Sequence, residues 1–300
     1  MRIIVTGSAG FIGSHLVSEL VKDHFVTPID RANVTGWDLK LGAPDVRGYD
    51  AVIHLAAQVG RVFGEDDLLS TVMDNAGVTA LIAQACGEAN VRLLYASTSE
   101  IYGDGGDKNW NEDHFAVSDD YRSHAYLPHN LYGLSKRWGE EVCRLYAPKD
   151  LTIMRFSMPY GPGLPAGRGR AAIINFLYDA LWDRPLHVHK HSERSWCWIK
   201  DTIAGVRLLL EEGHSGAFNI GRDDNAVSMK TVAEMACDLV GASRDLIEMV
   251  DPPERQTVVK RLSTEKIRGL GWRPTVDLQE GMARTLEFVR TLPAPDLVAA

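Results

Sequence analysis

The chain is poor in cysteine, and its cysteines do not have the spacing of a metal or disulfide framework. Four cysteines occur in 300 residues, far apart and without a C-x-x-C pair: Cys86, Cys143, Cys197 and Cys237. A sparse set of this kind argues against a zinc site or a disulfide scaffold and favours small buried thiols in a reducing compartment. We therefore expect a cytoplasmic protein.

The sequence also lacks long hydrophobic runs and any basic stripe. No apolar run reaches the length of a membrane span, and Met1-Arg2 leads directly into the first expected strand, so neither a membrane helix nor a signal peptide is expected. The formal net charge is −8, without a block of like charges, which argues against nucleic acid as a partner. The hydrophobic content of 45% and the length suit a globular protein with a sizeable core.

The most informative stretch that is present is Thr-Gly-Ser-Ala-Gly-Phe-Ile-Gly, residues 6–13. A short apolar run, residues 3–5, precedes it, and apolar residues recur after it every four positions, as on a helix face. A strand, a glycine turn and a helix N-terminus in this order direct backbone N–H groups at an anion. Gly7 allows the tight turn, Gly10 admits a phosphate close to the backbone, and Gly13 lets helix and strand pack closely. These residues predict the pyrophosphate site of a dinucleotide.

The next acidic residue narrows the choice of dinucleotide. Asp30 ends the second apolar run at the spacing expected of a carboxylate that binds the adenosine ribose hydroxyls. Such a carboxylate repels a 2′-phosphate and so favours NAD over NADP. Arg31 beside it is the opposing signal, because a guanidinium pairs with a 2′-phosphate. We expect NAD.

Strand-like runs alternate with helical patterns through the first half of the chain. The strands are expected at 3–6, 24–30, 51–55, 91–96 and 151–156, and the helices at 11–22, 67–89 and 131–147. This alternation predicts an α/β fold with a doubly wound parallel sheet. From Tyr160 the pattern changes to a glycine- and proline-rich loop, followed by a helix near 170–182, a strand at 186–189, a helix at 201–212, a strand at 218–220 and a helix from about 229.

Two residues of the helix expected at 131–147 have the chemistry of a general base. Tyr132 and Lys136 lie one turn apart and share a helix face. A phenol is a poor base at neutral pH, but an ammonium and a nicotinium cation nearby would lower its pKa. Tyr132 could then take a proton from a sugar hydroxyl during hydride transfer.

A second polar cluster follows the strand expected at 91–96. The hydroxyls of Ser97, Thr98 and Ser99 and the carboxylate of Glu100 come at its C-terminal end, the edge at which open α/β sheets bind ligands. The hydroxyls could bind the same substrate oxygen that Tyr132 deprotonates. The alternative is an ordinary strand-to-loop turn rich in serine and threonine.

Together these segments resemble the extended short-chain dehydrogenase/reductase family, specifically its NAD-dependent nucleotide-sugar epimerases, dehydratases and decarboxylases. The resemblance covers nearly the whole chain and includes the motifs at 6–13, 38–39, 54–57, 97–100, 132–136, 160–163, 194–201, 218–221 and 270–274. It implies a Rossmann domain and a smaller C-terminal substrate-binding domain. It also implies a nucleotide-diphosphate sugar as substrate, and a homodimer paired through the helices at 67–89 and 131–147.

The resemblance assigns roles to individual residues. Thr98 would orient the sugar hydroxyl, Tyr132 would be the base, Lys136 would hold the nicotinamide ribose, and Glu100 would act near carbons 4 and 5. Residues expected to bind NAD are Gly7, Gly10, Phe11, Ile12, Gly13, Asp30, Asp38, Leu39, Leu55, Ala56, Ala57, Tyr132 and Lys136. Ser99, Arg194 and Arg255 are expected to bind the substrate, the two arginines through phosphate or carboxylate groups.

Within the family, the trio Thr98-Ser99-Glu100 looks like that of UDP-glucuronate decarboxylases and GDP-mannose dehydratases. The stretch 106–114 is also similar to the decarboxylases. Dehydratases acting on thymidine-linked glucose carry aspartate where this chain has Ser99, and simple 4-epimerases need no acid at position 100. One departure is Met158, where the family has asparagine, so the placement of the sugar phosphate does not carry over.

We therefore expect an NAD-dependent enzyme that oxidises a nucleotide sugar transiently at carbon 4. Epimerisation is the first interpretation; decarboxylation or dehydration using Glu100 is the alternative, and a keto-sugar reductase is the second alternative. The domain boundaries expected are 1–157 for the NAD-binding domain, with returning segments at about 190–222, then 158–189 and 223–292 for the substrate domain, and 293–300 as a tail.

Three alternating histidines, His187, His189 and His191, could suggest a metal site. No carboxylate pair follows them at a suitable spacing, so we expect no metal and interpret them as a polar rim. Trp196 and Trp198 could stack on a base, but core packing is the commoner fate of tryptophan.

Overall fold

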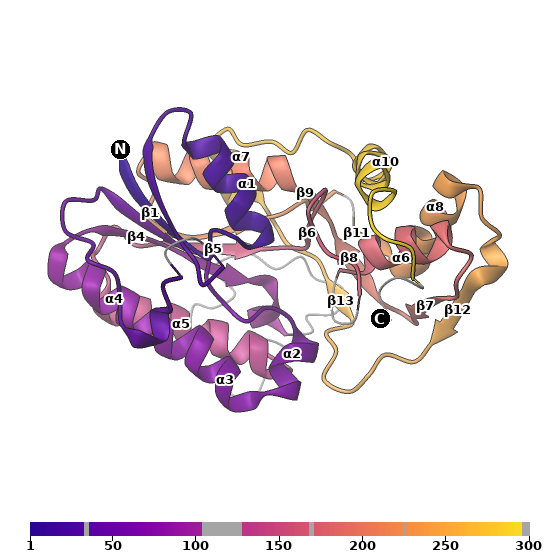
Figure 1. Cartoon of the computed structure of the whole chain (residues 1–300), viewed down its shortest axis with the longest axis horizontal. Helices are drawn as coiled ribbons and strands as arrows, with labels where there is room; N and C mark the ends of the chain where they lie inside the picture. Colours follow the sequence, from indigo (N-terminus) through magenta and orange to yellow (C-terminus); the bar gives the residue numbers. More distant parts are fainter. Residues whose placement is uncertain (33–35, 104–127, 168–170, 225, 296–300) are drawn as a thin grey trace.

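A six-stranded sheet organises the larger part of the molecule, which we call the first lobe (Figure 1). All its strands are parallel, in the order β10-β5-β4-β3-β1-β2. They are β1 (Arg2–Thr6), β2 (Phe25–Ile29), β3 (Ala51–His54), β4 (Arg92–Thr98), β5 (Thr152–Phe156) and β10 (Gly216–Ile220). The expected α/β fold with a doubly wound parallel sheet is confirmed.

The computed structural model describes residues 1–32, 36–103, 128–167, 171–224 and 226–295. Within these residues, helices cover both faces of the sheet (Figure 1). One face carries α1 (Phe11–Leu20) and α7 (Ile199–Glu211); the other carries α2 (Arg61–Asp66), α3 (Leu68–Val72), α4 (Val78–Ala89) and α5 (Leu131–Tyr146). None of the described helices is long and apolar enough to cross a membrane.

Strand side chains alternate between the two faces, and both faces are apolar. In β1, Ile3 and Val5 join the core beneath α1 and α7, whereas Ile4 joins the core beneath α4 and α5. Leu93 and Leu94 of β4 divide in the same way. Because helices cover both faces, these strands are continuous hydrophobic runs rather than alternating ones.

Strand β2 contains Pro28, which has no N–H to donate to the sheet. The structure places β2 at the edge of the sheet, where Pro28 is paired with Val5. An edge strand tolerates a residue that cannot donate to the ladder.

The helical pattern at 67–89 is realised as three consecutive pieces. Between α3 and α4 lies a π-helical turn, η2 (Met73–Gly77), whose wider winding rotates Asn75 into a buried position. Single π turns of this type inside α-helices often accompany functional sites.

The rest of the chain builds a smaller second lobe beside the first (Figure 1). Its helices are α6 (Ala172–Leu181), α8 (Met229–Val240) and α10 (Leu278–Val289), with the shorter α9 (Glu265–Gly269) near β10. Its strands are β6 (Pro159–Tyr160), β7 (Leu186–His189), β8 (Glu193–Ser195), β9 (Cys197–Trp198), β11 (Ala226–Ser228), β12 (Ile247–Val250) and β13 (Val259–Lys260). Ser228 caps α8 by accepting the N–H of Thr231 at 3.0 Å.

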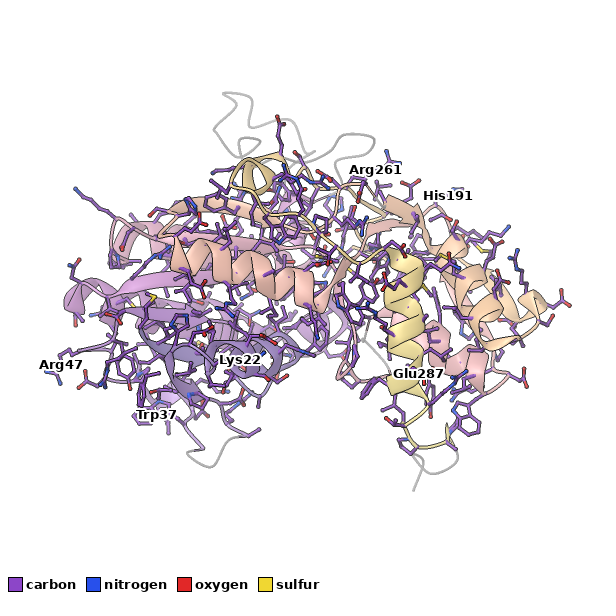
Figure 2. All side chains as sticks on the ribbon, turned by 90° about the horizontal axis from the view of Figure 1, so that it is seen from above. Lys22, Trp37, Arg47, His191, Arg261 and Glu287 are labelled. Carbon is purple, nitrogen blue, oxygen red and sulfur yellow. The ribbon has the colours of Figure 1, made fainter. Side chains whose placement is uncertain are left out.

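Charged side chains, among them Lys22, Arg47 and Glu287, lie on the outside of the lobes (Figure 2). Between the lobes the apolar core is continuous, and it includes Trp196 and Trp198, which pack edge-on against Tyr160. The two tryptophans are thus core residues.

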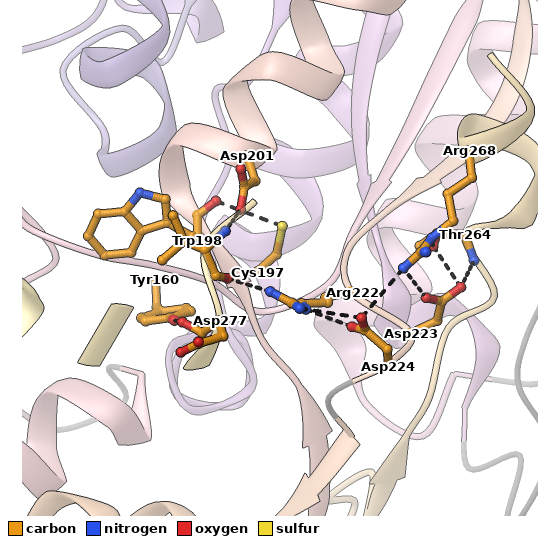
Figure 3. A network of polar contacts seen from close by, with 11 residues as sticks. Tyr160, Cys197, Trp198, Asp201, Arg222, Asp223, Asp224, Thr264, Arg268 and Asp277 are labelled. Carbon is orange, nitrogen blue, oxygen red and sulfur yellow. Dashed lines mark hydrogen bonds and ion pairs between the residues drawn. The ribbon is translucent and has the colours of Figure 1, made fainter. Parts of the chain in front are cut away.

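A polar network reinforces the junction between the lobes at the end of β10 (Figure 3). Arg222 pairs with Asp224 at 2.6 Å and donates to the carbonyl of Val276, just before α10, at 2.5 Å. Arg268 of α9 pairs with Asp223 at 2.6 Å. Because these contacts join segments far apart in the chain, they fix the second lobe against the end of the sheet.

A buried ion pair lies between α5 and the sheet. The carboxylate of Glu140 accepts two hydrogen bonds from Arg155 of β5, at 3.0 and 2.8 Å, and one from Ser97 of β4 at 2.5 Å. Both charged side chains are 1% exposed. Burial alone would raise the pKa of Glu140, but Arg155 and Ser97 hold it below its ordinary value. The pair therefore stays ionised and anchors α5 on the sheet.

Replacing Glu140 by alanine should destabilise the protein by about 3–5 kcal/mol, because Arg155 would remain charged and buried without its partner. Chemical denaturation followed by circular dichroism measures this loss. Glu287→Ala is the matched control, since Glu287 pairs with Arg290 at an exposed site and should change stability by about 1 kcal/mol or less. Equal effects of the two variants would contradict the anchoring role.

Candidate active site

The glycine turn between β1 and α1 is packed so closely that side chains do not fit. Gly7 has φ of +70°, and a Cβ there would lie 2.6 Å from the backbone nitrogen of Ala56. A Cβ on Gly13 would lie 2.1 Å from the carbonyl oxygen of Gly7. No side chain caps α1, so the N–H groups at Phe11, Ile12 and Gly13 face the turn as an anion cradle.

This turn lies at the topological switch point of the sheet, where β1 stands between β2 and β3. The segment after β3 runs beside it: Leu55 donates its N–H to the carbonyl of Thr6 at 3.1 Å, and Ala56 donates to the Thr6 hydroxyl at 3.4 Å. Ligands of doubly wound sheets bind in this crevice. The residues expected to bind NAD at 6–13 and 55–57 are thus brought together.

Asp30 ends β2 beside the glycine turn. Its carboxylate accepts the N–H of Ala9 at 3.1 Å and that of Ala32 at 3.0 Å. Asp38 caps a short 3₁₀ turn, η1 (Leu39–Leu41), by accepting the N–H of Lys40 at 3.0 Å, and Leu39 is buried. Asp30 is therefore already oriented by the loop that would hold the pyrophosphate.

The structure brings together Thr98, at the end of β4, and Tyr132, in the first turn of α5. The two side chains are neighbours, close enough for Thr98 to act on the pKa of Tyr132, and both are buried. Asn130 begins α5 by accepting the N–H of Gly133 on its side-chain oxygen at 2.9 Å. This cap fixes the start of the helix and hence the position of Tyr132.

Lys136 lies one turn further along α5 and is 2% exposed. Its ammonium is 4.8 Å from the centre of the Tyr95 ring, but within the described part of the chain it has no hydrogen-bond partner. A buried ammonium without an acceptor is costly unless a ligand supplies one. The residues present therefore fit NAD, whose nicotinamide ribose hydroxyls would be the acceptors for Lys136.

The protonation states in the protein alone differ from those expected for a catalytic base. Burial raises the pKa of Tyr132 well above its usual range, and burial lowers the pKa of Lys136 to about 8. The low pKa expected for Tyr132 is thus absent here and would need the positive charge of the bound cofactor. His54, buried between Thr6 and Thr79, has its pKa lowered to about 3 by burial and stays neutral.

Glu100 lies just after β4 in the 3₁₀ turn η3 (Ser99–Tyr102) and is fully engaged. It forms an ion pair with Lys260 of β13, accepts the hydroxyl of Thr257 at 2.7 Å, and accepts the side-chain amide of Asn130 at 3.3 Å. Burial alone would raise the pKa of Glu100, but Lys260 and Thr257 lower it to about 2. Glu100 is thus a carboxylate held beside Thr98 and Tyr132.

Lys260, Thr257 and Asn130 were not found from the sequence. Lys260 and Thr257 stand 160 and 157 positions after Glu100, in a segment without a recognisable motif. For Asn130, the sequence offers one signal: an asparagine just before an expected helix. This signal indicates a helix cap rather than a functional site.

Asn75 is a further buried residue that the sequence did not single out. From the π turn η2 it accepts the N–H of Gln58 at 2.7 Å and donates to the Gln58 carbonyl and to the Ser135 hydroxyl, both at 3.0 Å. Asn75 therefore joins the segment after β3 to α5, the two walls of the crevice.

Both serines beside Thr98, Ser97 and Ser99, are buried. The hydroxyl of Ser97 donates to Glu140 under α5, so the expectation that it shares a substrate oxygen with Tyr132 was wrong. Period-two alternation along β4 turns Ser97 to the α5 side. Ser99, in η3, is 2% exposed, and its part in substrate binding stays a prediction.

The two arginines expected at the substrate lie in the second lobe. Arg194 of β8 is buried and donates to the backbone carbonyls of Thr257 and Val258. Arg255 is 63% exposed and pairs with Glu65 of α2 at 2.7 Å. Both arginines thus act on the segment that carries Thr257, and direct contact with a substrate stays a prediction.

Met158 follows β5 in the left-handed region, with φ of +38°. The other non-glycine residues with positive φ are exposed, but Met158 is partly buried and packs against the core. A long side chain in this conformation is strained, and strain of this kind clusters at functional sites.

Two further expectations concern the stretch 106–114 and the alternating histidines. The stretch 106–114, similar to the decarboxylases, lies outside the described residues. Among those described, no group of three His, Cys, Asp or Glu residues could hold a metal. His187 pairs with Glu248 at 3.3 Å, and His191 lies at the outer surface of the second lobe (Figure 2).

Comparison with known proteins gives consistent matches. The model described as "NAD dependent epimerase/dehydratase family" matches residues 3–221. UDP-glucuronic acid decarboxylase 1 of Xenopus tropicalis is 30% identical over 96% of this chain and 72% of that protein. The dTDP-glucose 4,6-dehydratase of an Actinoplanes strain is 28% identical over 97% of this chain and 98% of that protein. The solved UDP-glucuronic acid 4-epimerase of Bacillus cereus, in complex with UDP-glucuronic acid and NAD, superposes with a TM-score of 0.83 at 26% identity, covering 97% and 99% of the two chains.

Replacing Lys260 by methionine should raise the pKa of Glu100 from about 2 to above its ordinary value of 4.5, because burial is then no longer opposed by the ammonium. In the unaltered protein the pair stabilises the fold at pH above about 4.5, and this stabilisation is lost as the pH falls toward 2. A carboxyl ¹³C NMR titration measures the pKa of Glu100 in the unaltered protein and in the variant. Lys266→Met, which removes an ammonium directed at the Ala217 carbonyl, should leave Glu100 unchanged; an unchanged pKa in Lys260→Met would refute the assignment.

Proposed function

Because the chain belongs to the NAD-dependent epimerase/dehydratase family, we propose that it removes the carboxyl group of a nucleotide-linked hexuronic acid. The chain is an NAD-dependent enzyme of the nucleotide-sugar epimerases, dehydratases and decarboxylases. Which of these reactions it performs is the subject of the proposal. UDP-glucuronic acid is the first substrate to test.

The observation that carries the proposal is the state of Glu100. Epimerisation at carbon 4 needs only oxidation, rotation of the keto sugar and reduction, for which Thr98, Tyr132 and Lys136 suffice. This chain adds an ionised carboxylate, paired with Lys260, at the edge of the same crevice. Burying charged groups costs solvation free energy, and such groups cluster at functional sites. The buried pair therefore favours a second chemical step beside carbon 4. For this reason we propose decarboxylation in place of epimerisation, which was the first interpretation of the sequence.

The proposed reaction begins with the C4 hydroxyl of the sugar. NAD, which the glycine turn and Lys136 would hold, would supply the hydride acceptor and donor for carbon 4. Tyr132 takes the hydroxyl proton while Thr98 holds the oxygen, and Lys136 holds the cofactor and supplies positive charge near the phenol. The resulting 4-keto acid is a β-keto acid.

Loss of CO₂ from carbon 5 leaves the bonding electron pair on an enolate whose oxygen is O4. Tyr132 and Thr98 would stabilise that oxygen by hydrogen bonds. Carbon 5 then takes up one proton from the solvent, and Glu100 would orient the groups that deliver it. Reduction at carbon 4 returns the proton held by Tyr132 to O4, so atoms and charges balance.

Epimerisation at carbon 4 is the second candidate. The likeness to the Bacillus cereus 4-epimerase favours it, since that enzyme acts on a uronic acid without removing its carboxyl group. A reductase that uses free NADPH is disfavoured by Asp30, whose carboxylate lies beside the glycine turn. The division into an NAD-binding part at 1–157 and 190–222 and a substrate-binding remainder, with a cytoplasmic location, belongs to the same proposal.

Incubation of the enzyme with UDP-glucuronic acid in D₂O, followed by NMR, separates the candidates. We expect a UDP-pentose with one deuterium at carbon 5, together with CO₂. Tyr132→Phe should lose about 10²–10⁴-fold in kcat and keep its affinity for NAD, because it loses the proton acceptor and keeps the ring. Glu100→Gln should still oxidise the sugar and accumulate reduced nicotinamide absorbance.

Different products lead to different conclusions. A UDP-hexuronic acid inverted at carbon 4 and free of deuterium would replace decarboxylation by epimerisation. Normal turnover by Glu100→Gln would make Glu100 a spectator and would also contradict the proposal.

We also propose a homodimer formed through α3, α4 and α5. The polar side of α5 faces the sheet, whereas its apolar side, with Leu134, Trp138 and Leu145, is exposed. The neighbouring helices add Leu69 and Met73 to the same exposed apolar set. A helix with an outward apolar face is typical of a subunit interface.

Light scattering at micromolar concentration should give the mass of a dimer for the unaltered protein. Trp138→Glu should shift it toward the monomer, because the new charge would be buried at the interface. Trp182→Glu is the control, since Trp182 is similarly exposed but lies on the second lobe. A monomeric unaltered protein would end the proposal.

A further inference from the structure

One segment of the second lobe reaches across to the start of the catalytic helix. It comprises residues 251–258 and joins β12 to β13 (Figure 1). Its contacts with the first lobe surround the beginning of α5: Thr257 donates to Glu100, and the carbonyl of Arg255 accepts from Asn130 at 3.5 Å. Lys260 follows directly and pairs with the same Glu100. The position of the 251–258 segment therefore sets the surroundings of Glu100.

Glu65 of α2 holds this segment from the other side. One carboxylate oxygen accepts a hydrogen bond from the N–H of Leu131 at 3.2 Å, and the other pairs with Arg255 at 2.7 Å. Leu131 precedes Tyr132 and is the first residue of α5, where a negative charge is favoured by the helix dipole. A single side chain thus bridges the 251–258 segment and the turn that carries Tyr132.

The backbone at Arg255 supports a specific role for this bridge. Arg255 has φ of +60°, a conformation that is strained for a residue with a Cβ. Such strain persists only where surrounding contacts determine it. The contacts found at Arg255 are the ion pair to Glu65 and the hydrogen bond from Asn130, both to the first lobe.

We infer that Glu65 is a positioning residue that couples the 251–258 segment to the first turn of α5. Through Arg255 it keeps Thr257 and Lys260 on Glu100, and through Leu131 it fixes Tyr132. The base and the carboxylate pair are thereby held in one arrangement. The inference deepens the proposed function and rests on it only for the consequence in turnover.

The first test uses the substrate-free protein and measures amide hydrogen exchange by mass spectrometry. Glu65→Gln keeps an acceptor for Leu131 and loses the charge; Arg255→Asn loses the guanidinium and keeps a residue that tolerates positive φ. Both should speed exchange in the 251–258 segment by about threefold to fivefold, the size expected when a largely exposed pair is lost. High salt should do the same to the unaltered protein.

Controls separate the bridge from general destabilisation. Arg255→Lys should restore most of the protection, and Glu65→Gln with Arg255→Asn together should match either single change. Arg244→Asn removes a comparably exposed pair with Asp238 and should leave the 251–258 segment unchanged. Additive single changes, or unchanged exchange in both, would overturn the inference.

The second test follows turnover of UDP-glucuronic acid. In Glu65→Gln, loss of the bridge should lower kcat by a similar factor with little change in KM, because the groups displaced act on the reacting carbons rather than on the nucleotide. A raised KM at constant kcat would overturn the coupling to the catalytic groups. If the unaltered enzyme does not turn over this substrate, the proposed function fails while the exchange test still decides the role of Glu65.

Discussion

Helix α5 packs its polar face against the sheet, and the site depends on the partners that these buried polar groups require. A helix normally buries its apolar face, but here Tyr132, Lys136 and Glu140 face β4 and β5. Each buried polar group needs a partner. Glu140 has Arg155 and Ser97, Tyr132 has Thr98, and Lys136 has none within the described chain. Among these three side chains, the unmet requirement is that of Lys136, at the place where NAD fits.

The same logic extends across the crevice. The glycine turn leaves no room for side chains, and no side chain caps the N–H groups that begin α1, so those groups are available to a ligand. Asp30 and Asn75 orient the loops on either side of it through backbone hydrogen bonds. Rigid walls with unsatisfied donors between them are what preorganised binding requires.

The second lobe contributes charge. Lys260 and Thr257 come from a segment distant in sequence, yet they determine that Glu100 remains a carboxylate despite its burial. Arg194 holds that segment by donating to the backbone carbonyls of Thr257 and Val258. The network of Arg222 and Asp224 secures the second lobe to the end of β10. The electrostatics of the first lobe's catalytic edge are therefore a property of both lobes.

Local pattern in the sequence determined the six strands of the large sheet, the helices that follow the glycine turn and carry Tyr132, the glycine turn itself, Asp30 and the Thr98, Tyr132 and Lys136 set, because each depends on periodicity or on spacing within one or two elements. Tertiary structure decided the rest. The edge position of Pro28, the inward turn of Ser97, the charge state of Glu100 and the engagement of Arg255 with Glu65 each depend on a partner far along the chain. Sequence spacing carries no information on such pairings, since they arise only when segments far apart in the chain pack together.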